Sequence, residues 1–406
     1  FYRGDYRQPQ HAVSPGGLTV AAPSGKALTI ADNNPDSKFS GRRLAYARWL
    51  TSGEHPLVAR VLVNRFWLHH FGRGIVQTPD EFGKLGMLPT HPQLLDWLAW
   101  DLVEPSMEPV GGRGPVAWKK GSPESRPWSM KHLHRLIVTS SAYRRSSTHP
   151  DLPSLDRLDP GRTSYCVFRP RRLAAEEIRD AMLAVSGELN PKPGGLPARP
   201  DMNLEAALQP RMIMGTFAPS YVPDPLPEQR NRRTIYALKL RGQRDPFLAT
   251  FNQPSPDSSC ERRDTSNVTP QVFALFNSQE SSDRALALAA RVLKEDDSDQ
   301  QAIALAFRLT FGRQADPTEQ AAALAHWNDS TRLQARPPAR RNTLPTTITR
   351  RANEENTGEV FTFTETLFEY RDYVPDLQPH QVDARTRGLA QLCLALFNAN
   401  EFLYVH

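Results

Sequence analysis

The 11 histidines are the side chains most able to do chemistry, because an imidazole can bind a metal or move a proton near neutral pH. A catalytic zinc site commonly takes two ligands from histidines four residues apart on a helix. The chain has no H-x-x-x-H and no H-E-x-x-H. Satisfied structural histidines are therefore favoured over a metal site, for which the weak candidates are His70, His91 and His134.

Carboxylates in the same part of the chain could act as acid and base. In glycoside hydrolysis one acid donates a proton while the other attacks the sugar or activates water. Asp80, Glu81 and Asp96, together with His134, are the candidate catalytic residues. Residues 176–180 hold three further acids, but the surrounding arginines favour helical ion pairs there. The absence of G-x-S-x-G, of a Walker loop and of G-x-G-x-x-G after a strand argues against a serine hydrolase, a P-loop enzyme and a dinucleotide site.

A binding role would rest on aromatic and cationic side chains, which stack on rings and pair with anions. The first 150 residues carry a net positive charge and residues 275–406 a net negative charge. No dense basic stripe with interleaved aromatics is present, so nucleic acid is not an expected partner. The candidate binding residues are Arg65, Trp67, His70, His91, Trp97, His134 and Arg135.

Length and composition limit the class of protein. The 406 residues can form one large domain or several smaller ones, each with its own core. No apolar stretch is long enough to span a membrane. The three cysteines are far apart and form neither C-x-x-C nor C-x-x-C-H, so no Cys-built zinc site or covalent haem is expected. The chain begins at Phe1 without an initiator Met, which suggests a fragment or a mature piece.

Hydrophobic periodicity predicts a mainly α fold, an irregular helical domain with long Pro-rich loops and minor β hairpins. The expected organisation is an N-terminal segment (1–40) with a possible hairpin, a basic helical core (41–190), Pro-rich loops (191–264) and a C-terminal helical bundle (265–406). Residues 329–383 are an expected insertion in that bundle, and the whole is expected to be one integrated domain. The predicted helices are 42–51, 56–70, 91–102, 130–140, 171–189, 270–277, 280–294, 299–311, 317–328 and 384–402.

Other segments are expected to be irregular or extended. Residues 105–127 have almost no aliphatic side chains and are predicted to be an exposed excursion. Weak alternation predicts one short strand at 233–240, and stronger alternation predicts a strand pair around 360–368. The link 149–160 and the segment 190–230 are expected to be loops because of their prolines.

Many short motifs in a fixed order resemble those of the planctomycete-type domain of unknown function 1553. The resemblance extends from about residue 1 to residue 406. The segments that carry it are Asn64-Arg65-Phe-Trp67-Leu-His69-His70-Phe71-Gly72, Thr78-Pro-Asp-Glu-Phe82-Gly83, Thr90-His91-Pro92, Asp96-Trp97-Leu98, Lys131-His-Leu-His134-Arg135, Ser140-Ser141-Ala-Tyr143-Arg144, Arg171-Arg172-Leu-Ala-Ala-Glu176-Glu177, Phe251-Asn-Gln-Pro254, Ser259-Cys260-Glu-Arg262-Arg263 and Asn398-Ala-Asn400-Glu401-Phe402.

The resemblance implies a setting rather than a reaction. Such domains are usually the C-terminal part of large secreted or periplasmic proteins that carry a cytochrome-c-like domain and a second uncharacterised domain upstream. It implies a periplasmic or extracellular location, roles near polysaccharide degradation or electron transfer, and no cofactor in this chain, with any haem on an upstream domain. The excursion 105–127 and the insertion 329–383 depart from the usual pattern.

Two functions follow as expectations. The leading one is a non-catalytic module that binds or organises partners, either the upstream cytochrome-like and uncharacterised domains or a glycan. The alternative is a hydrolase acting on carbohydrate or sulfated glycan through a His and carboxylate site. The residues do not decide whether the protein is an enzyme. The hydrolase requires its carboxylates and histidines to converge within hydrogen-bonding reach.

Overall fold

The computed structural model describes residues 1–405 except 20–21, 23–24, 26–27, 36–37, 106–125, 214–215, 296–297, 337, 339–343 and 355–356. The chain divides into two compact units, which are described separately below. Unit 1 is formed by residues 1–171 and unit 2 by residues 172–405. The described chain is mainly α, with small antiparallel strand pairs, as the sequence predicted. None of its described helices combines the length and apolarity needed to cross a membrane.

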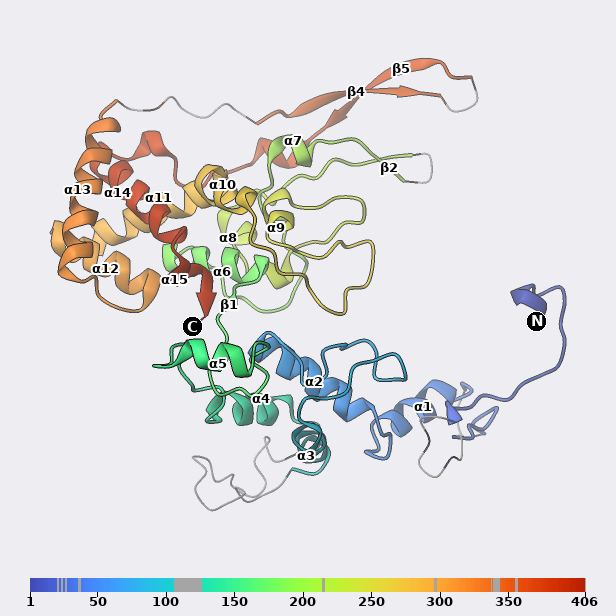
Figure 1. Cartoon of the computed structure of the whole chain (residues 1–406). Coiled ribbons are helices and arrows are strands. Elements are labelled where there is room, and N and C mark those ends of the chain that lie inside the picture. Colours follow the sequence, from blue (N-terminus) through green and yellow to red (C-terminus); the bar gives the residue numbers. More distant parts are fainter. Residues whose placement is uncertain are drawn as a thin grey trace. The chain divides into compact units, whose positions relative to one another are not determined.

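In unit 1, helices α3 and α4 pack against α2 (Figure 1). Pro92 at the start of α3 and the Ser129 side chain, which accepts a hydrogen bond from the His132 amide, define two of the helix N-termini. Apolar residues of α2, α3 and α4 face inward, among them Val63, Leu98 and Ile137. The helices are α1 (Arg42–Leu50), α2 (Val58–Phe71), α3 (Pro92–Val103), α4 (Met130–Thr139) and α5 (Leu152–Leu158), preceded by the 3-10 turn η1 (Tyr2–Gly4).

Four predicted helices of unit 1 are confirmed with small shifts at their ends, and α5 is a helix where a loop was expected. Asp151 caps α5 by accepting the Ser154 amide, and Pro153 lies in the first turn, where a proline is compatible with a helix. The expected N-terminal hairpin is present as an antiparallel bridge between Gly16 and Thr29. Part of its turn, and most of the excursion 105–127, lie outside the described residues.

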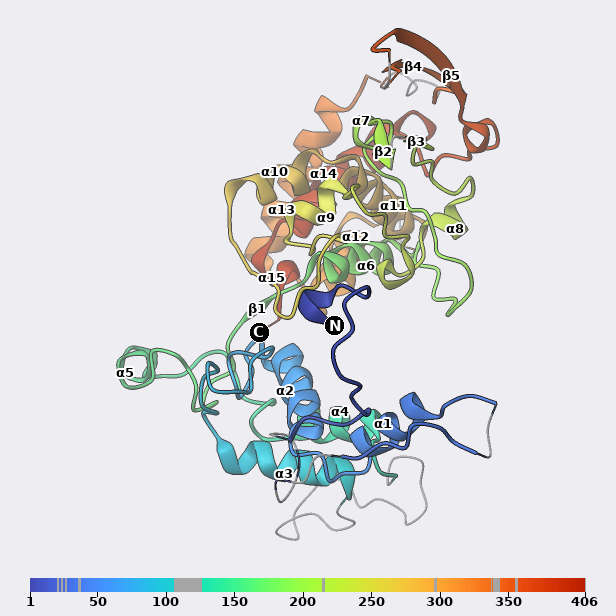
Figure 2. The ribbon, with the colours of Figure 1, turned by 90° about the vertical axis from the view of Figure 1, so that its right-hand side faces the viewer.

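Unit 2 has a continuous apolar core between long helices. Helix α14 packs against both α11 and α13, and α11 also packs against α6 (Figures 1 and 2). Trp327 of α13 and Phe397 of α14 are among the large side chains buried in this core. The longer helices are α6 (Ala175–Ser186), α10 (Thr269–Asn277), α11 (Gln279–Glu295), α12 (Asp299–Phe311), α13 (Pro317–Leu333) and α14 (Ala384–Phe397).

Shorter elements connect these helices. The β4–β5 pair lies at one edge of unit 2 (Figure 2) and aligns Thr347 with Thr366. The predicted extended segment at 360–368 is confirmed as β5, and its partner is the preceding segment. The shorter elements are α7 (Leu204–Ala207), β2 (Arg211–Ile213), β3 (Thr216–Ala218), α8 (Pro227–Arg230), η5 (Thr234–Tyr236), α9 (Pro246–Thr250), β4 (Thr347–Asn353), β5 (Val360–Thr366), η6 (Phe368–Arg371), η7 (Pro379–Gln381), α15 (Asn400–Leu403) and β6 (Tyr404–Val405), while β1 (Arg171–Arg172) spans the boundary between the units.

Three predictions for unit 2 were wrong in detail. The strand expected at 233–240 is a 3-10 turn at its start, because the Asp180 carboxylate accepts both the amide and the hydroxyl of Thr234. The helix expected at 171–189 begins only at Ala175, since the Glu177 carboxylate accepts the Ala174 amide and caps it there. The expected terminal helix 384–402 is interrupted after Phe397, and α15 forms a separate turn.

Candidate functional site

Helices α2 and α4 bring two of the candidate histidines together. His70 Nε2 lies 2.8 Å from His134 Nδ1, a hydrogen bond in which one ring donates and the other accepts. The Phe66 ring meets His134 edge-on at a centroid distance of 4.7 Å, and the Tyr143 ring meets His70 edge-on at 5.7 Å. The two imidazoles therefore form a pair enclosed by aromatic edges.

The surroundings of His70 favour its neutral form. Burial lowers the pKa of His70, and the positive charges of His134, His69 and Arg171 lower it further. A neutral imidazole can accept a proton at neutral pH, which is the first requirement for a general base. The histidine pair can thus accept a proton, but general-base catalysis also requires a bound substrate and a second catalytic side chain.

A second ring cluster gathers around Tyr165. Its ring lies 5.2 Å from Trp67, 5.1 Å from Phe71 and 5.5 Å from His91, measured between centroids. Trp67 is only 4% exposed, so its main role is packing within unit 1. Burial raises the pKa of the Tyr165 hydroxyl, which stays protonated. Among the candidate binding residues, Trp67 and His91 both contact Tyr165, whereas His70 and His134 contact each other.

The outward face of α3 holds a third group of polar and aromatic residues. Gln93, Asp96, Trp97 and Trp100 follow the spacing of one helical face, whereas Leu95, Leu98 and Leu102 are buried on the other. Trp100 is 51% exposed and Trp97 is half-buried.

This face also carries a charge pair. Arg60 of α2 donates to the Asp96 carboxylate at 2.6 Å, and both side chains are partly exposed. Sequence reasoning named Asp96 and Trp97 but not Trp100 or Arg60. The spacing of two tryptophans three residues apart was the available signal.

The candidate catalytic carboxylates do not join the histidines in the described part of the chain. Asp80 is exposed, and the Glu81 carboxylate accepts the Gly83 amide at 2.7 Å within a turn. Asp96 is paired with Arg60. Among the described residues, no hydrogen bond or ion pair links any of these three carboxylates to a histidine.

The described residues do contain a close histidine and carboxylate pair, between α4 and α3. His132 Nε2 of α4 lies 2.5 Å from the Asp101 carboxylate of α3, and both side chains are almost completely buried. Because solvent and substrate do not reach it, this pair joins the two helices rather than acting on a ligand.

The remaining binding candidates lie on the surface. Arg65 of α2 and Arg135 of α4 are exposed. Over the residues that the structure describes, no group of three or more His, Cys, Asp or Glu side chains is arranged to hold a metal ion. His91 therefore does not complete a three-ligand site with His70 and His134.

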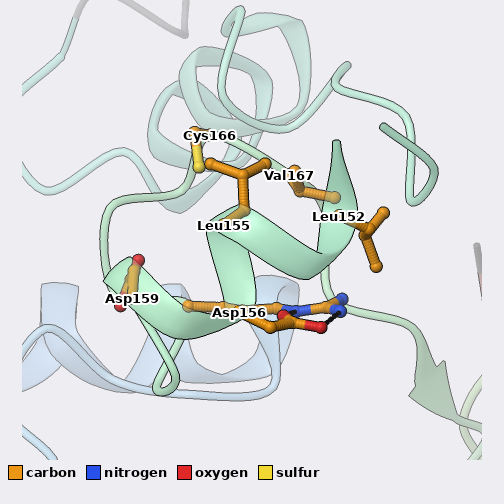
Figure 3. Close-up of a pocket in the computed structure, with 7 residues that line it drawn as sticks. Leu152, Leu155, Asp156, Asp159, Cys166 and Val167 are labelled. Atoms are coloured by element: carbon orange, nitrogen blue, oxygen red, sulfur yellow. Dashed lines mark hydrogen bonds and ion pairs between the residues drawn. The ribbon is translucent and has the colours of Figure 1, made fainter. Parts of the chain in front are cut away.

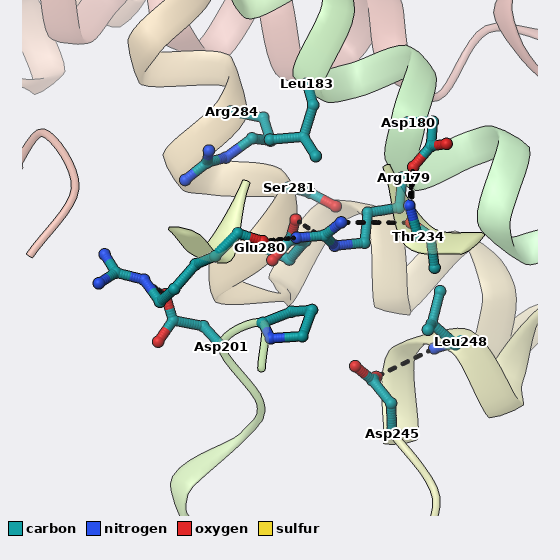
Figure 4. A network of polar contacts seen from close by, with 12 residues as sticks. Arg179, Asp180, Leu183, Asp201, Thr234, Asp245, Leu248, Glu280, Ser281 and Arg284 are labelled. Carbon is teal, nitrogen blue, oxygen red and sulfur yellow. Dashed lines mark hydrogen bonds and ion pairs between the residues drawn. The ribbon is translucent and has the colours of Figure 1, made fainter. Parts of the chain in front are cut away.

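Unit 2 contains two acids with strongly raised pKa values, in a buried network of arginines and carboxylates (Figure 4). Arg230 and Arg284 are fully or almost fully buried and share the Asp376 carboxylate. Arg230 also pairs with Asp201 at 2.8 Å, and Arg284 with Glu188 at 2.9 Å. Burial raises the pKa of Asp201 to about 6 and that of Glu188 to about 7.

This network connects segments that are distant in sequence. Arg179 of α6 donates to the carbonyls of Arg230 and Arg232 and lies 3.4 Å from the Glu280 carboxylate of α11. Arg230 also donates to the Val374 carbonyl at 2.9 Å. The arginines satisfy loop carbonyls as well as carboxylates, so we assign the network to the folding of the Pro-rich segments. The sequence predicted that the acids of α6 pair with neighbouring arginines of the same helix; Glu176 instead pairs with Arg263, 87 residues further along the chain, and Asp180 lies 3.6 Å from Arg233.

Comparison with protein families gives a match, over residues 42–327, to a model described as "Protein of unknown function (DUF1553)". Comparisons with curated proteins and with solved structures give no match. The matched residues include α2 and α4 with the His70 and His134 pair, the outward face of α3, and most of the arginine network of unit 2. The chain therefore belongs to the DUF1553 family, as its motifs suggested.

Proposed function

We propose that this chain is a non-catalytic binding module whose ligand is a glycan. The observation that supports this proposal is the outward face of α3, where Trp97 and Trp100 lie beside Gln93, Asp96 and Arg60. A half-exposed tryptophan leaves a large apolar ring in water, which is typical of surfaces that bind a partner. A sugar ring presents an apolar C–H face for such a ring and hydroxyls for the flanking polar groups.

The geometry suits an elongated ligand. Seven residues of helix separate Gln93 from Trp100, which corresponds to about 10 Å along the axis. Polar and aromatic contacts would therefore follow one another along the chain of a polysaccharide. The Arg60 and Asp96 pair offers donors and acceptors on the same face, and both remain accessible.

The proposed setting follows the family resemblance. We place the module in the periplasm or outside the cell, within planctomycete-type proteins that act in polysaccharide use or electron transfer. Its other partners would be the cytochrome-like and uncharacterised domains upstream, with haem carried there and no cofactor in this chain.

The experiment is a glycan array followed by titration of the best ligand. Trp100→Ala should weaken binding about tenfold or more, since truncating an interfacial tryptophan commonly costs at least about 1.4 kcal/mol. Phe273→Ala, which removes another exposed ring from α10, should leave binding unchanged. Absence of any glycan ligand, or equal loss in both variants, would contradict the proposal.

A hydrolase is the second candidate, favoured by the neutral state of His70 beside His134. It predicts release of new reducing ends from the bound polysaccharide, and loss of that release in His70→Gln. A bound glycan that stays intact over a long incubation would leave the binding module as the function.

A further inference from the structure

The pocket beside α5 is too small for an organic ligand (Figure 3). It is lined by Leu152, Leu155, Cys166 and Val167, among others, and its volume of about 10 Å³ leaves room for about one water molecule. A pocket beside α9 has a volume of about 30 Å³, which admits a few water molecules. The open edge of strand β5, by contrast, presents backbone groups that can bind a macromolecule.

The hairpin of β4 and β5 has a defined alternation of hydrogen-bonded residues. At one end the Leu367 amide donates to the Thr346 carbonyl at 2.8 Å, and at the other end the Glu354 amide donates to the Glu359 carbonyl at 2.8 Å. In an antiparallel pair every second residue exchanges such bonds, and the residues between them direct their amides and carbonyls away from the partner strand. With the observed register, the residues of β5 that point away from β4 are Val360, Thr362, Thr364 and Thr366.

These backbone groups form an open edge. Among the strands that the structure describes, β4 and β5 form a sheet of two, so no strand covers the far side of β5. Thr362 and Thr364 are exposed, as are Val360 and Phe361. Figure 2 shows the hairpin at the margin of unit 2. A row of open amides and carbonyls on an extended strand is a template for pairing with another strand.

The inner face of the hairpin holds this edge in place. Arg350 of β4 donates to the Glu365 carboxylate at 3.1 Å, and this carboxylate also accepts the Ser220 amide at 2.6 Å. The Phe363 ring contacts Phe217 of β3 at a centroid distance of 5.4 Å. Because the strand is already ordered by these contacts, pairing with a partner costs less conformational entropy.

The edge of β5 lacks the features by which proteins block an open strand. Charged side chains and prolines at an edge prevent pairing, and the outward-pointing residues of β5 include neither. The outward-pointing residues of β4 include the exposed Arg351. The segment Val360–Thr366 is also rich in β-branched and aromatic residues, which favour strands. Pairing is therefore expected at β5 and not at β4.

Strand β5 is complementary to a second copy of itself. When two copies pair antiparallel about a two-fold axis at Phe363, their open backbone groups face each other, and Thr362 of each copy lies opposite Thr364 of the other. Threonines paired in this way stabilise a sheet. The single charged residue of the strand, Glu365, lies opposite Phe361 of the other copy, so no like charges meet.

We propose that β5 pairs with β5 of a second copy of this chain, which forms a four-stranded antiparallel sheet across the two-fold axis of a dimer. The contact is the same surface on both copies, so the assembly closes at two subunits. The β4 strands lie at the outer edges of this sheet, where self-pairing about Arg350 would place two arginines opposite each other. The dimer contact is independent of the α3 face and its ligand.

Sedimentation velocity of the whole chain tests the proposal. Total protein concentrations from about 1 μM to about 300 μM cover weak and moderate association. Over this range the parent should convert from monomer to dimer. A monomer at every concentration overturns the proposal, and so does growth past the dimer into a continuous series of larger species.

Matched proline variants locate the contact. The Thr364 amide points away from β4, so Thr364→Pro removes a donor from the open edge and leaves the bonds between β4 and β5 in place. It should raise the dimer dissociation constant at least about tenfold, because each dimer loses two hydrogen bonds. Thr349→Pro changes the residue directly opposite on β4 and should leave the constant unchanged. Equal dissociation constants for the two proline variants overturn the proposal.

A charge exchange tests the register without altering the backbone. Thr364→Lys should weaken the dimer, because the two introduced charges lie diagonally across the axis and repel each other. Adding Thr362→Glu places opposite charges face to face and should restore the affinity, and a double variant as weak as Thr364→Lys overturns the pairing. Trp100→Ala should dimerise as the parent does, so failure of this proposal and failure of the glycan proposal are distinguishable.

Discussion

His70 of α2 and His134 of α4 share a hydrogen bond of 2.8 Å between two ring nitrogens. Such a bond requires at least one neutral ring, because two imidazolium ions would both present donors. The contact between α2 and α4 at this point therefore depends on the protonation state of His70 and His134.

The first prediction concerns this pair and pH. The pKa of His70 is lowered in the folded state, so the unfolded chain binds a proton more readily. Stability should therefore fall as pH decreases below the ordinary histidine value of 6.5. His70→Gln, which does not titrate, should reduce this dependence, and His11→Gln on the exposed N-terminal segment should not. Chemical denaturation at pH values above and below 6.5 provides the measurement. Identical pH profiles of the unfolding free energy for the parent, His70→Gln and His11→Gln would contradict the lowered pKa of His70.

The second prediction concerns Glu188, whose pKa burial raises from 4.5 to about 7. The folded state then holds a proton that the unfolded state has lost, so the stability contributed by Glu188 declines as pH rises from 4.5 to about 7. Compared with Glu188→Gln, the parent should lose about 1 to 3 kcal/mol of unfolding free energy over that range. The exposed acid Glu205 of α7 provides the control, since Glu205→Gln should follow the parent. If the difference in unfolding free energy between the parent and Glu188→Gln stays constant over this pH range, the prediction of a raised Glu188 pKa is wrong.

The third prediction tests the shared carboxylate of the buried network. Asp376 serves both Arg230 and Arg284, which are 0% and 2% exposed at their side chains. Asp376→Asn should destabilise unit 2 by about 3 to 5 kcal/mol, because two buried guanidinium groups lose their common counter-charge. Asp329→Asn removes an exposed ion pair with Arg332 and should cost at most about 1 kcal/mol. Urea unfolding of both variants distinguishes them, and similar losses would mean that the network is solvated.

The fourth prediction concerns the contact between α13 and α14. A Cβ on Gly388 would lie 2.7 Å from the amide nitrogen and 2.8 Å from the Cα of Thr331. In an exposed helix Gly→Ala stabilises by about 1 kcal/mol, but here the clash should make it destabilising. Because the clash involves backbone atoms, Thr331→Ala should not restore stability in the double variant. Thermal unfolding measures both effects, and recovery in the double variant would trace the clash to the Thr331 side chain.

The fifth prediction concerns Asn64, a buried residue of a family motif. Its amide donates to the Val76 carbonyl at 2.9 Å and accepts the Val76 amide at 2.8 Å. Asn64→Asp removes the donor and buries a charge, so it should destabilise unit 1 by at least about 2 kcal/mol. Gly74→Ala should also destabilise, since its Cβ would lie 2.9 Å from the Asn64 amide. Denaturant titration tests both, and a neutral Asn64→Asp would show that the pair of bonds is dispensable.

The sequence alone determined the helical class, the ends of most long helices and the family. These features rest on periodicity, caps and motif order, which neighbouring residues encode locally. It also named Asp96 and Trp97 as candidates, and both lie on the outward face of α3. The partner of His70 was not identifiable, because His134 is 64 residues away and only the packing of α2 against α4 brings them together.

Other features also depend on contacts between residues that are distant in the sequence, so only the tertiary structure reveals them. Thr234 was expected in a strand because its neighbours alternate, but the Asp180 carboxylate takes its backbone amide instead. The burial of Arg230 is equally invisible in a Pro-rich segment that resembles a solvated loop. Partners from distant segments determine both the turn at Thr234 and the burial of Arg230. The sequence supplies the charged and polar residues, and folding decides which of them are desolvated and paired.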